Sequence, residues 1–160
     1  MKPKTVLLRL YPAVALVLAG NLVAQAQESL FGTWNMNAAK SKYSPGPAPK
    51  SNIAKWEAFQ GRVKLTVDVV PAKDQTQHWE SSGMFDGKDN PIIGKNPDAD
   101  TAAFSKIDAR TYEVVYKKGG KTTLTAHTVV AADGKTRITT QTGKDAQGQT
   151  VNNTMFYEKQ

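Results

Sequence analysis

Apolar and polar side chains alternate along several stretches of the chain, most regularly in residues 62–70. The apolar members of this stretch are Val63, Leu65, Val67 and Val69, and between them stand Lys64, Thr66 and Asp68. A period of two places the two sets on opposite faces of a β-strand. The stretch therefore predicts a strand with one buried face and one face in solvent.

Comparable stretches follow one another along the chain, separated by residues that favour turns. The predicted strands are residues 32–37, 52–59, 62–70, 77–85, 101–107, 111–117, 121–131, 136–142 and 149–158. Gly119-Gly120 and Asp133-Gly134 provide the positive φ angles that tight hairpin turns need. Residues 86–91 and 96–100 are predicted turns, with Ile92-Ile93 as a short strand between them. Helical periodicity is absent after residue 26, so the pattern predicts an all-β fold of about nine or ten strands linked mainly by hairpins.

A meander of this kind leaves two strand edges exposed unless the sheet closes on itself. Closure gives an antiparallel up-and-down β-barrel, which is the architecture that we predict, and a two-sheet sandwich is the alternative. Residues 38–51 include Pro45, Pro47 and Pro49. Proline removes backbone donors and fixes φ, so this segment is predicted to be an extended crossing with no helical lid.

The first 26 residues have the features of a signal peptide. Lys2, Lys4 and Arg9 are followed by an apolar run over residues 10–20 and by Ala24-Gln25-Ala26, a small-residue cleavage site. A retained membrane anchor is the alternative, but the apolar run is shorter than the roughly 20 residues that a spanning helix needs. We therefore expect cleavage after Ala26, a secreted or periplasmic protein, and a single domain formed by residues 27–160.

The charge of the predicted domain is small and scattered. The chain has 21 Lys and Arg and 14 Asp and Glu, and removal of the three basic residues of the signal peptide leaves a surplus of four positive charges. A basic face interleaved with aromatic residues is absent from the sequence, so nucleic-acid binding is not expected. Outward positions of the predicted strands hold Lys64, Asp68, Glu113 and Lys117, which argues against membrane insertion. We expect a monomer that is stabilised without cysteine, by packing and strand pairing.

Residues at both ends of the predicted domain resemble known ligand-binding barrels. Phe31-Gly32-Thr33-Trp34 resembles the first strand of fatty-acid-binding proteins and, more loosely, of lipocalins, and residues 153–159 are similar to the last strand of the fatty-acid-binding group. The chain after residue 26 also resembles a group of small exported bacterial proteins, without an assigned activity, that carry GTW, AKSKYSPGPAPKS and YEKQ. The resemblance to lipocalins and fatty-acid-binding proteins implies a calycin-type barrel that binds a small molecule in its interior, whereas the likeness to the exported group implies no function.

Two departures from the fatty-acid-binding proteins bear on the ligand. Those proteins have a helix–turn–helix lid after the first strand, where this chain has the proline-rich segment. They also bind the ligand carboxylate with an arginine two positions before the last-strand tyrosine, which here is Tyr157, and that position is Met155. We therefore expect a small apolar or amphipathic ligand and do not assign a fatty acid.

Large aromatic side chains and one arginine are the candidate ligand-binding residues. The cavity candidates are Trp34, Trp56, Trp79, Phe104, Tyr112, Tyr116, Arg137 and Tyr157. Aromatic residues also dominate ordinary β-protein cores, so a dry core is the alternative. Arg137 would replace the missing carboxylate anchor if it faces inward with Thr139 and Gln141. In the other register Ile138 and Thr140 face inward and Arg137 lies in solvent, as arginines mostly do.

The sequence contains little that points to catalysis. It lacks a Gly-x-Ser-x-Gly elbow, a phosphate-binding loop and a dinucleotide fingerprint. His78 and Glu80 share one face of a predicted strand, but a catalytic metal usually needs three protein ligands and no third one is indicated. We therefore predict a non-catalytic binding protein without metal or cofactor. The alternatives are a ligand-free interaction or structural module of the cell envelope that acts through loops such as residues 40–49, and a small hydrolase or isomerase that uses His78 and Glu80.

Overall fold

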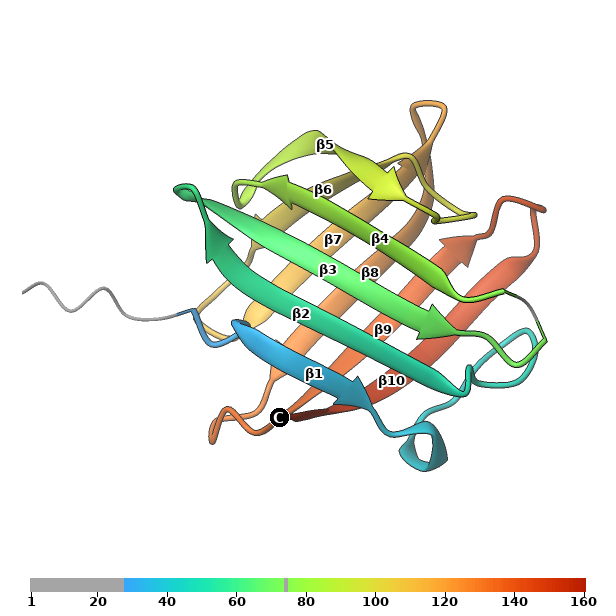
Figure 1. Cartoon of the computed structure of the whole chain (residues 1–160), viewed down its shortest axis with the longest axis horizontal. Coiled ribbons are helices and arrows are strands. Elements are labelled where there is room, and N and C mark those ends of the chain that lie inside the picture. Colours follow the sequence, from blue (N-terminus) through green and yellow to red (C-terminus); the bar gives the residue numbers. More distant parts are fainter. Residues whose placement is uncertain (1–27, 74) are drawn as a thin grey trace, which may run out of the picture.

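The computed structural model describes residues 28–73 and 75–160. Its ten antiparallel strands form a closed barrel in which each strand pairs with its neighbours along the chain and β10 pairs with β1 (Figure 1). The strands are β1 (Gly32–Met36), β2 (Ser51–Phe59), β3 (Arg62–Val70), β4 (Gln77–Gly83), β5 (Asp86–Gly94), β6 (Thr101–Lys106), β7 (Thr111–Lys118), β8 (Lys121–Val130), β9 (Thr136–Lys144) and β10 (Thr150–Lys159). The predicted up-and-down barrel is confirmed and the sandwich is excluded. The predicted signal peptide, residues 1–26, lies outside the described residues.

Residues 86–91 form part of a strand, with an irregularity between Asp86 and Asp89 where Gly87 has a φ of +71°, and the predicted turn does not separate two strands. These residues belong to β5, which begins at Asp86. Pro91 fits this strand because the Ile92 amide donates to the Asp100 carbonyl on the β6 side, which turns the proline nitrogen toward β4. β5 pairs with β4 only from Ile92 to Gly94, so no ladder hydrogen bond is lost at Pro91.

The barrel has a packed base and a mouth at the opposite end. The base is where the chain enters β1, and its most deeply buried large side chains are Leu30, Trp34, Phe104, Tyr112 and Val130. The mouth is where β3 leads to β4, β5 to β6, and β9 to β10 (Figure 1). Residues 37–50, all of them described, also lie at the mouth and contain one 3-10 turn, η1 (Ala38–Lys40), followed by a bridge from Lys42 to Thr154. They form no α-helical lid, as predicted.

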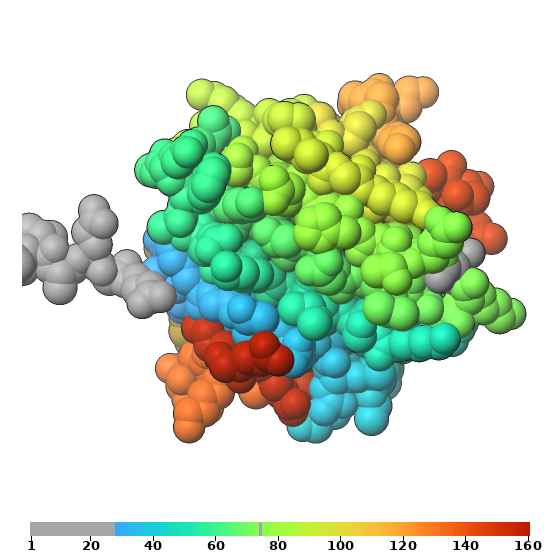
Figure 2. Space-filling view, in the orientation of Figure 1, coloured from blue at the N-terminus to red at the C-terminus, as the bar shows by residue number. Residues whose placement is uncertain are grey.

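The Gly32-Thr33-Trp34 motif closes the base. Trp34 is fully buried, and its indole Nε1 donates a hydrogen bond to the Leu30 carbonyl at 2.8 Å. The Lys159 side chain of β10 passes over Gly32 and brings its Nζ to 4.9 Å from the centroid of a Trp34 ring. A Cβ at Gly32 would collide with that lysine. The lysine could move aside, but the φ of +132° at Gly32 also favours glycine. Figure 2 shows the blue residues of β1 against the red end of the chain.

Candidate functional site

The interior above the base contains a cavity of about 260 Å³. Its apolar wall comes from inward side chains of β2, β3, β4 and β7, which are Trp56, Leu65, Val67, Trp79, Val114 and Tyr116. Most of its polar side chains come from β8, β9 and β10, and they include Thr128, Arg137, Thr139, Gln141, Asn153 and Tyr157. The cavity is therefore amphipathic, with its polar side chains concentrated on β8, β9 and β10, although Asn52 of β2 and Gln77 of β4 also line it.

The polar wall follows from the register of β9. Arg137, Thr139 and Gln141 line the cavity, whereas Ile138 lies outside with 47% of its surface exposed. β9 pairs with β10 so that Arg137 stands opposite Tyr157, and this pairing selects one of the two registers that the sequence leaves open. An arginine inside and an isoleucine outside reverse the usual distribution, which makes this arginine the most informative residue of the wall.

Arg137 is a buried cation. Only 4% of the residue is exposed, and its Cζ lies 4.1 Å from the centroid of the Tyr157 ring and 5.2 Å from that of a Trp34 ring. Burial lowers the pKa of Arg137 to about 10, and the nearby hydroxyls of Tyr157 and Tyr116 act in the opposite direction. The guanidinium therefore keeps its charge at neutral pH.

Most of the hydrogen-bonding capacity of Arg137 is unused. Its Nη1 donates to Thr139 Oγ1 at 3.4 Å, and its buried Nε has no partner. In the residues that the structure describes, no Asp or Glu lies within ion-pair distance of the guanidinium. Buried charges are normally paired and hydrogen-bonded, so Arg137 departs from the rule.

Other residues that line the cavity also have polar atoms with weak or missing hydrogen bonds. Trp56 Nε1 is buried without a partner, as is one acceptor, Asn52 Oδ1. The Tyr157 hydroxyl donates only to Met155 Sδ, at 3.6 Å, and a thioether is a weak acceptor. Burial raises the pKa of Tyr157 and that of Tyr116, so both hydroxyls keep their protons at neutral pH. The cavity thus presents donors around a fixed positive charge.

The predicted cavity residues separate into two depths. Those that line the cavity are Trp56, Trp79, Tyr116, Arg137 and Tyr157. Trp34, Phe104 and Tyr112 do not line it but pack beneath it in the base, where Phe104 meets Trp56 edge-on with 5.3 Å between ring centroids. Residues of the base and residues of the cavity wall both lie on the inward faces of the strands. The alternation of apolar and polar residues therefore does not show which inward residues line the cavity.

Sequence reasoning missed several polar residues of the wall, among them Tyr43, Asn52 and Asn153. The period of β10 does locate Asn153 once Tyr157 is known to face inward, because the two are four positions apart. Tyr43 has no comparable signal, since it lies in the proline-rich segment. It is held at the cavity because the next amide, that of Ser44, donates to Asn153 Oδ1 at 3.0 Å.

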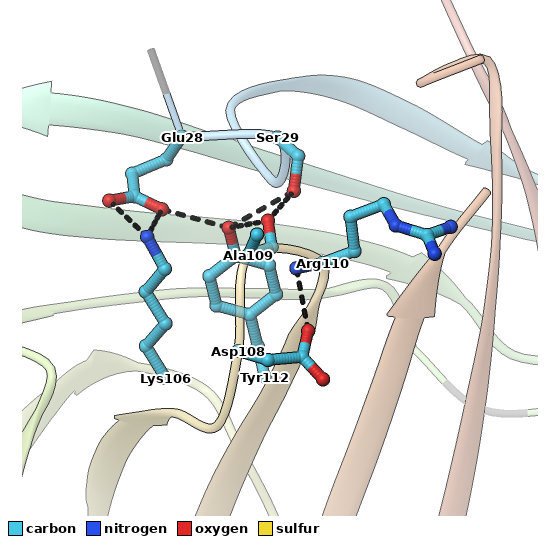
Figure 3. Close-up of polar contacts among 7 residues, drawn as sticks. All are labelled: Glu28, Ser29, Lys106, Asp108, Ala109, Arg110 and Tyr112. Atoms are coloured by element: carbon cyan, nitrogen blue, oxygen red, sulfur yellow. Dashed lines mark hydrogen bonds and ion pairs between the residues drawn. The ribbon is translucent and has the colours of Figure 1, made fainter. Parts of the chain in front are cut away.

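Tyr112 anchors the residues that precede β1, and Figure 3 shows this cluster. Its hydroxyl donates to Glu28 Oε2 at 2.8 Å and lies 3.1 Å from Ser29 Oγ. Lys106 forms an ion pair with Glu28 at 2.7 Å, and Ser29 Oγ donates to the Ala109 carbonyl at 2.9 Å. Glu28 and Ser29, which make these contacts, come directly before the buried Leu30, so the contacts hold the start of the described chain across the base.

His78 and Glu80 lie on the outer face of β4. His78 Nδ1 is 2.6 Å from Asp68 Oδ1, and Glu80 forms an ion pair with Lys64, in both cases across the β3–β4 ladder. Neither residue lines the cavity, so they do not converge in a pocket as the hydrolase or isomerase alternative requires. Within residues 28–73 and 75–160, three or more His, Asp or Glu side chains nowhere form a group that could hold a metal ion.

Comparisons of the chain with family models, curated proteins and solved structures identify no relative. No family model, curated protein or solved structure matches the chain. A closed antiparallel barrel of ten strands is consistent with a calycin-like barrel. In the part of the chain that the structure describes, no helix has the length and apolar character to cross a membrane.

Proposed function

We propose that the protein is an exported, non-catalytic barrel of the calycin type that binds one small apolar or amphipathic molecule in its interior. The cavity is the observation that supports this proposal. Small-molecule sites are concave and largely apolar, with a few polar groups that orient the ligand. Arg137, Tyr157 and Trp56 provide such groups here, next to an aromatic and aliphatic wall. Export rests on the signal-peptide features of residues 1–26.

The volume of the cavity limits the ligand. Small-molecule sites usually span roughly 300–1,000 Å³, and a cavity of about 260 Å³ lies just below that range. A compact molecule with a ring or a short chain suits this volume better than the long chain of a typical fatty acid. This limit agrees with the departure at Met155, which removes the anchor of the fatty-acid-binding group.

The polar groups of the cavity favour binding over reaction. The charged Arg137 and the protonated tyrosines are donors, and none of them is a general base at neutral pH. Among the described residues, Asp98 is the only acidic member of the wall, and its Oδ1 already accepts a hydrogen bond from the Ala146 amide at 3.0 Å. Apart from Asp98, the described residues of the wall include no candidate general base, which favours binding over proton transfer.

A matched pair of variants on β8 tests whether the cavity binds ligands. Ala126 lines the cavity, whereas its neighbour His127 faces solvent. Ala126→Phe fills the cavity, and His127→Phe adds a ring on the outside of the same strand. The probes are cinnamate, phenylacetate, octanoate and their primary amides, and binding is measured by calorimetry and by the fluorescence of Trp56 and Trp79.

We expect at least one probe to bind the wild-type protein one-to-one with a submillimolar Kd. Ala126→Phe should weaken that binding by about 10-fold or more, and His127→Phe should leave it unchanged. Ala126→Leu replaces the phenylalanine variant if the latter does not fold. The proposal fails if no probe binds the wild-type protein at about 1 mM, or if the cavity-filling variant binds as well as the wild type.

A further inference from the structure

The cavity contains a charge that the described residues do not neutralise. Arg137 is 4% exposed, and no carboxylate of residues 28–73 or 75–160 lies within ion-pair distance of it. Taking a guanidinium out of water is unfavourable unless an anion and hydrogen-bond acceptors replace its hydration. An anion bound beside Arg137 would therefore have a more favourable binding free energy than the same anion bound by an arginine on the protein surface.

The neighbours of Arg137 do not take the place of an anion. The rings of Tyr157 and Trp34, at 4.1 and 5.2 Å, provide only a modest cation–π attraction. Thr139 Oγ1 accepts the long hydrogen bond from Nη1 and is also hydrogen-bonded to Thr128 Oγ1 at 2.8 Å. Nε is buried without a partner and Nη1 makes only that long bond, so the protein does not replace the hydration that the guanidinium loses on burial.

The surrounding donors match the acceptor-rich character of an acid. The Tyr157 hydroxyl has only the Met155 sulfur as its acceptor, and the Tyr157 ring lies against the guanidinium of Arg137. A carboxylate accepts several hydrogen bonds, and its two oxygens match the fork of an arginine. A neutral alcohol or amide of the same size brings no charge and fewer acceptor sites.

Charges at the mouth do not oppose an acidic ligand. Among the described residues of the loops at the mouth, the carboxylates are those of Asp98, Asp100 and Asp145, and they are fewer than the lysines. The exposed lysines on the segments around the mouth are Lys40, Lys42, Lys50, Lys73, Lys95, Lys118, Lys121 and Lys144. A positive rim raises the local concentration of anions and the rate at which they reach the site.

We propose that the ligand is a compact amphipathic acid whose anionic group is bound by Arg137 while its apolar part lies against Trp56 and Trp79. This inference rests on the proposed function, because it concerns the same cavity. It narrows the ligand from any small apolar or amphipathic molecule to one that carries a negative charge at neutral pH. It also assigns the recognition of that charge to β9, where Arg137 lies.

Each acid in the probe set is compared with its own primary amide, which has nearly the same shape and no charge. The variants are Arg137→Met, which removes the charge, and Arg137→Lys, which keeps a charge without the fork. Arg110→Met is the matched control, since Arg110 is exposed on the turn between β6 and β7. Calorimetry at neutral pH gives the affinity of each acid and each amide for every variant.

We expect the wild-type protein and Arg110→Met to bind at least one acid about 10-fold or more tightly than its amide. Arg137→Met should bind the acid no better than the amide, with the affinity of the amide little changed. Arg137→Lys should retain part of the preference and also serves if the methionine variant does not fold. Equal affinities of acids and amides for the wild-type protein would overturn this inference and leave the proposed function standing. Absence of binding by every acid and amide would overturn both.

Discussion

Arg137 and Tyr157 face each other across the β9–β10 ladder, with the guanidinium carbon 4.1 Å from the centroid of the tyrosine ring. This contact is one of the few that compensate for burying the charge, because Thr139 adds only a hydrogen bond of 3.4 Å. A cation over an aromatic ring contributes about 0.5–2 kcal/mol. Desolvation of an ion costs several kcal/mol, so the protein without a bound anion keeps Arg137 at a net loss of stability.

Arg137→Met should therefore leave the free energy of unfolding unchanged or raise it by about 1 kcal/mol. Methionine can occupy the space of the arginine stem without a charge to desolvate. Urea denaturation of the wild-type protein and the variant measures the difference. A loss of more than about 2 kcal/mol would show that Arg137 holds the barrel together, and the energetic reason for an anion site would disappear.

Gly94 lets β5 lie close to β4 beside the cavity. Its φ is +101°, and a Cβ there would collide with the His78 carbonyl oxygen and come within 3.0 Å of the Trp79 Cα. Gly94→Ala should destabilise the protein by about 2–4 kcal/mol, since both contacts are with backbone atoms. Gly119 also has a positive φ, of +54°, but nothing lies within 4 Å of its Cβ position.

Gly119→Ala is the control for the conformational part of this effect and should cost only about 1 kcal/mol. Denaturation curves of the two variants separate the collision from the unfavourable φ. Trp79 lines the cavity, so Gly94→Ala should also weaken probe binding. Equal losses of stability in the two variants would show that β4 and β5 relax around the added methyl group.

Glu28 should make the stability of the base depend on pH. Burial raises the pKa of this carboxyl, but hydrogen bonds from Lys106 and Tyr112 outweigh it and hold the pKa below its usual value of 4.5. A group whose pKa is lowered by folding adds stability above its unfolded pKa, and that stability is lost as the pH falls through the folded value. Glu28→Gln should therefore lower the Tm by a few degrees at neutral pH.

The difference in Tm between Glu28→Gln and the wild type should shrink as the pH falls below 4.5. Thermal unfolding followed by circular dichroism across this range measures it. Glu57→Gln is the control, because Glu57 pairs with Lys55 on the outer surface and is not tied to the base. A difference that stays constant down to about pH 3 would mean that the carboxylate of Glu28 does not contribute through its charge.

Most of the barrel is predictable because the inward face of each strand produces alternation. Residues 62–70 form β3 with the predicted bounds, and Val63, Leu65 and Val67 are buried. β5 lacks this signal, since its register shifts between Asp86 and Asp89 and it meets β4 over only part of its length. Its residues carry turn chemistry, and pairing with β6 makes them a strand. Such long-range pairing is not visible in a local window of sequence.

The site is less predictable than the fold. Both faces of β9 are largely polar, because Thr139 and Gln141 alternate with Thr140 and Thr142. Alternation therefore gives no preference for an inward Arg137, and only the pairing with β10 decides it. The depth at which an aromatic side chain lies is also invisible to a period of two. Trp34 and Trp56 have the same pattern, yet one packs in the base and the other lines the cavity.

The closing seam of the barrel has a consequence for the order of folding. β1 pairs with β10 over three residue pairs, from Trp34–Lys159 to Met36–Tyr157, whereas β9 and β10 share nine. Hairpins form from neighbouring residues, but this seam joins opposite ends of the chain and must overcome the entropy of closing the whole loop. The ring should therefore close last and reopen first, with the amides of β1 exchanging with solvent before those of β9.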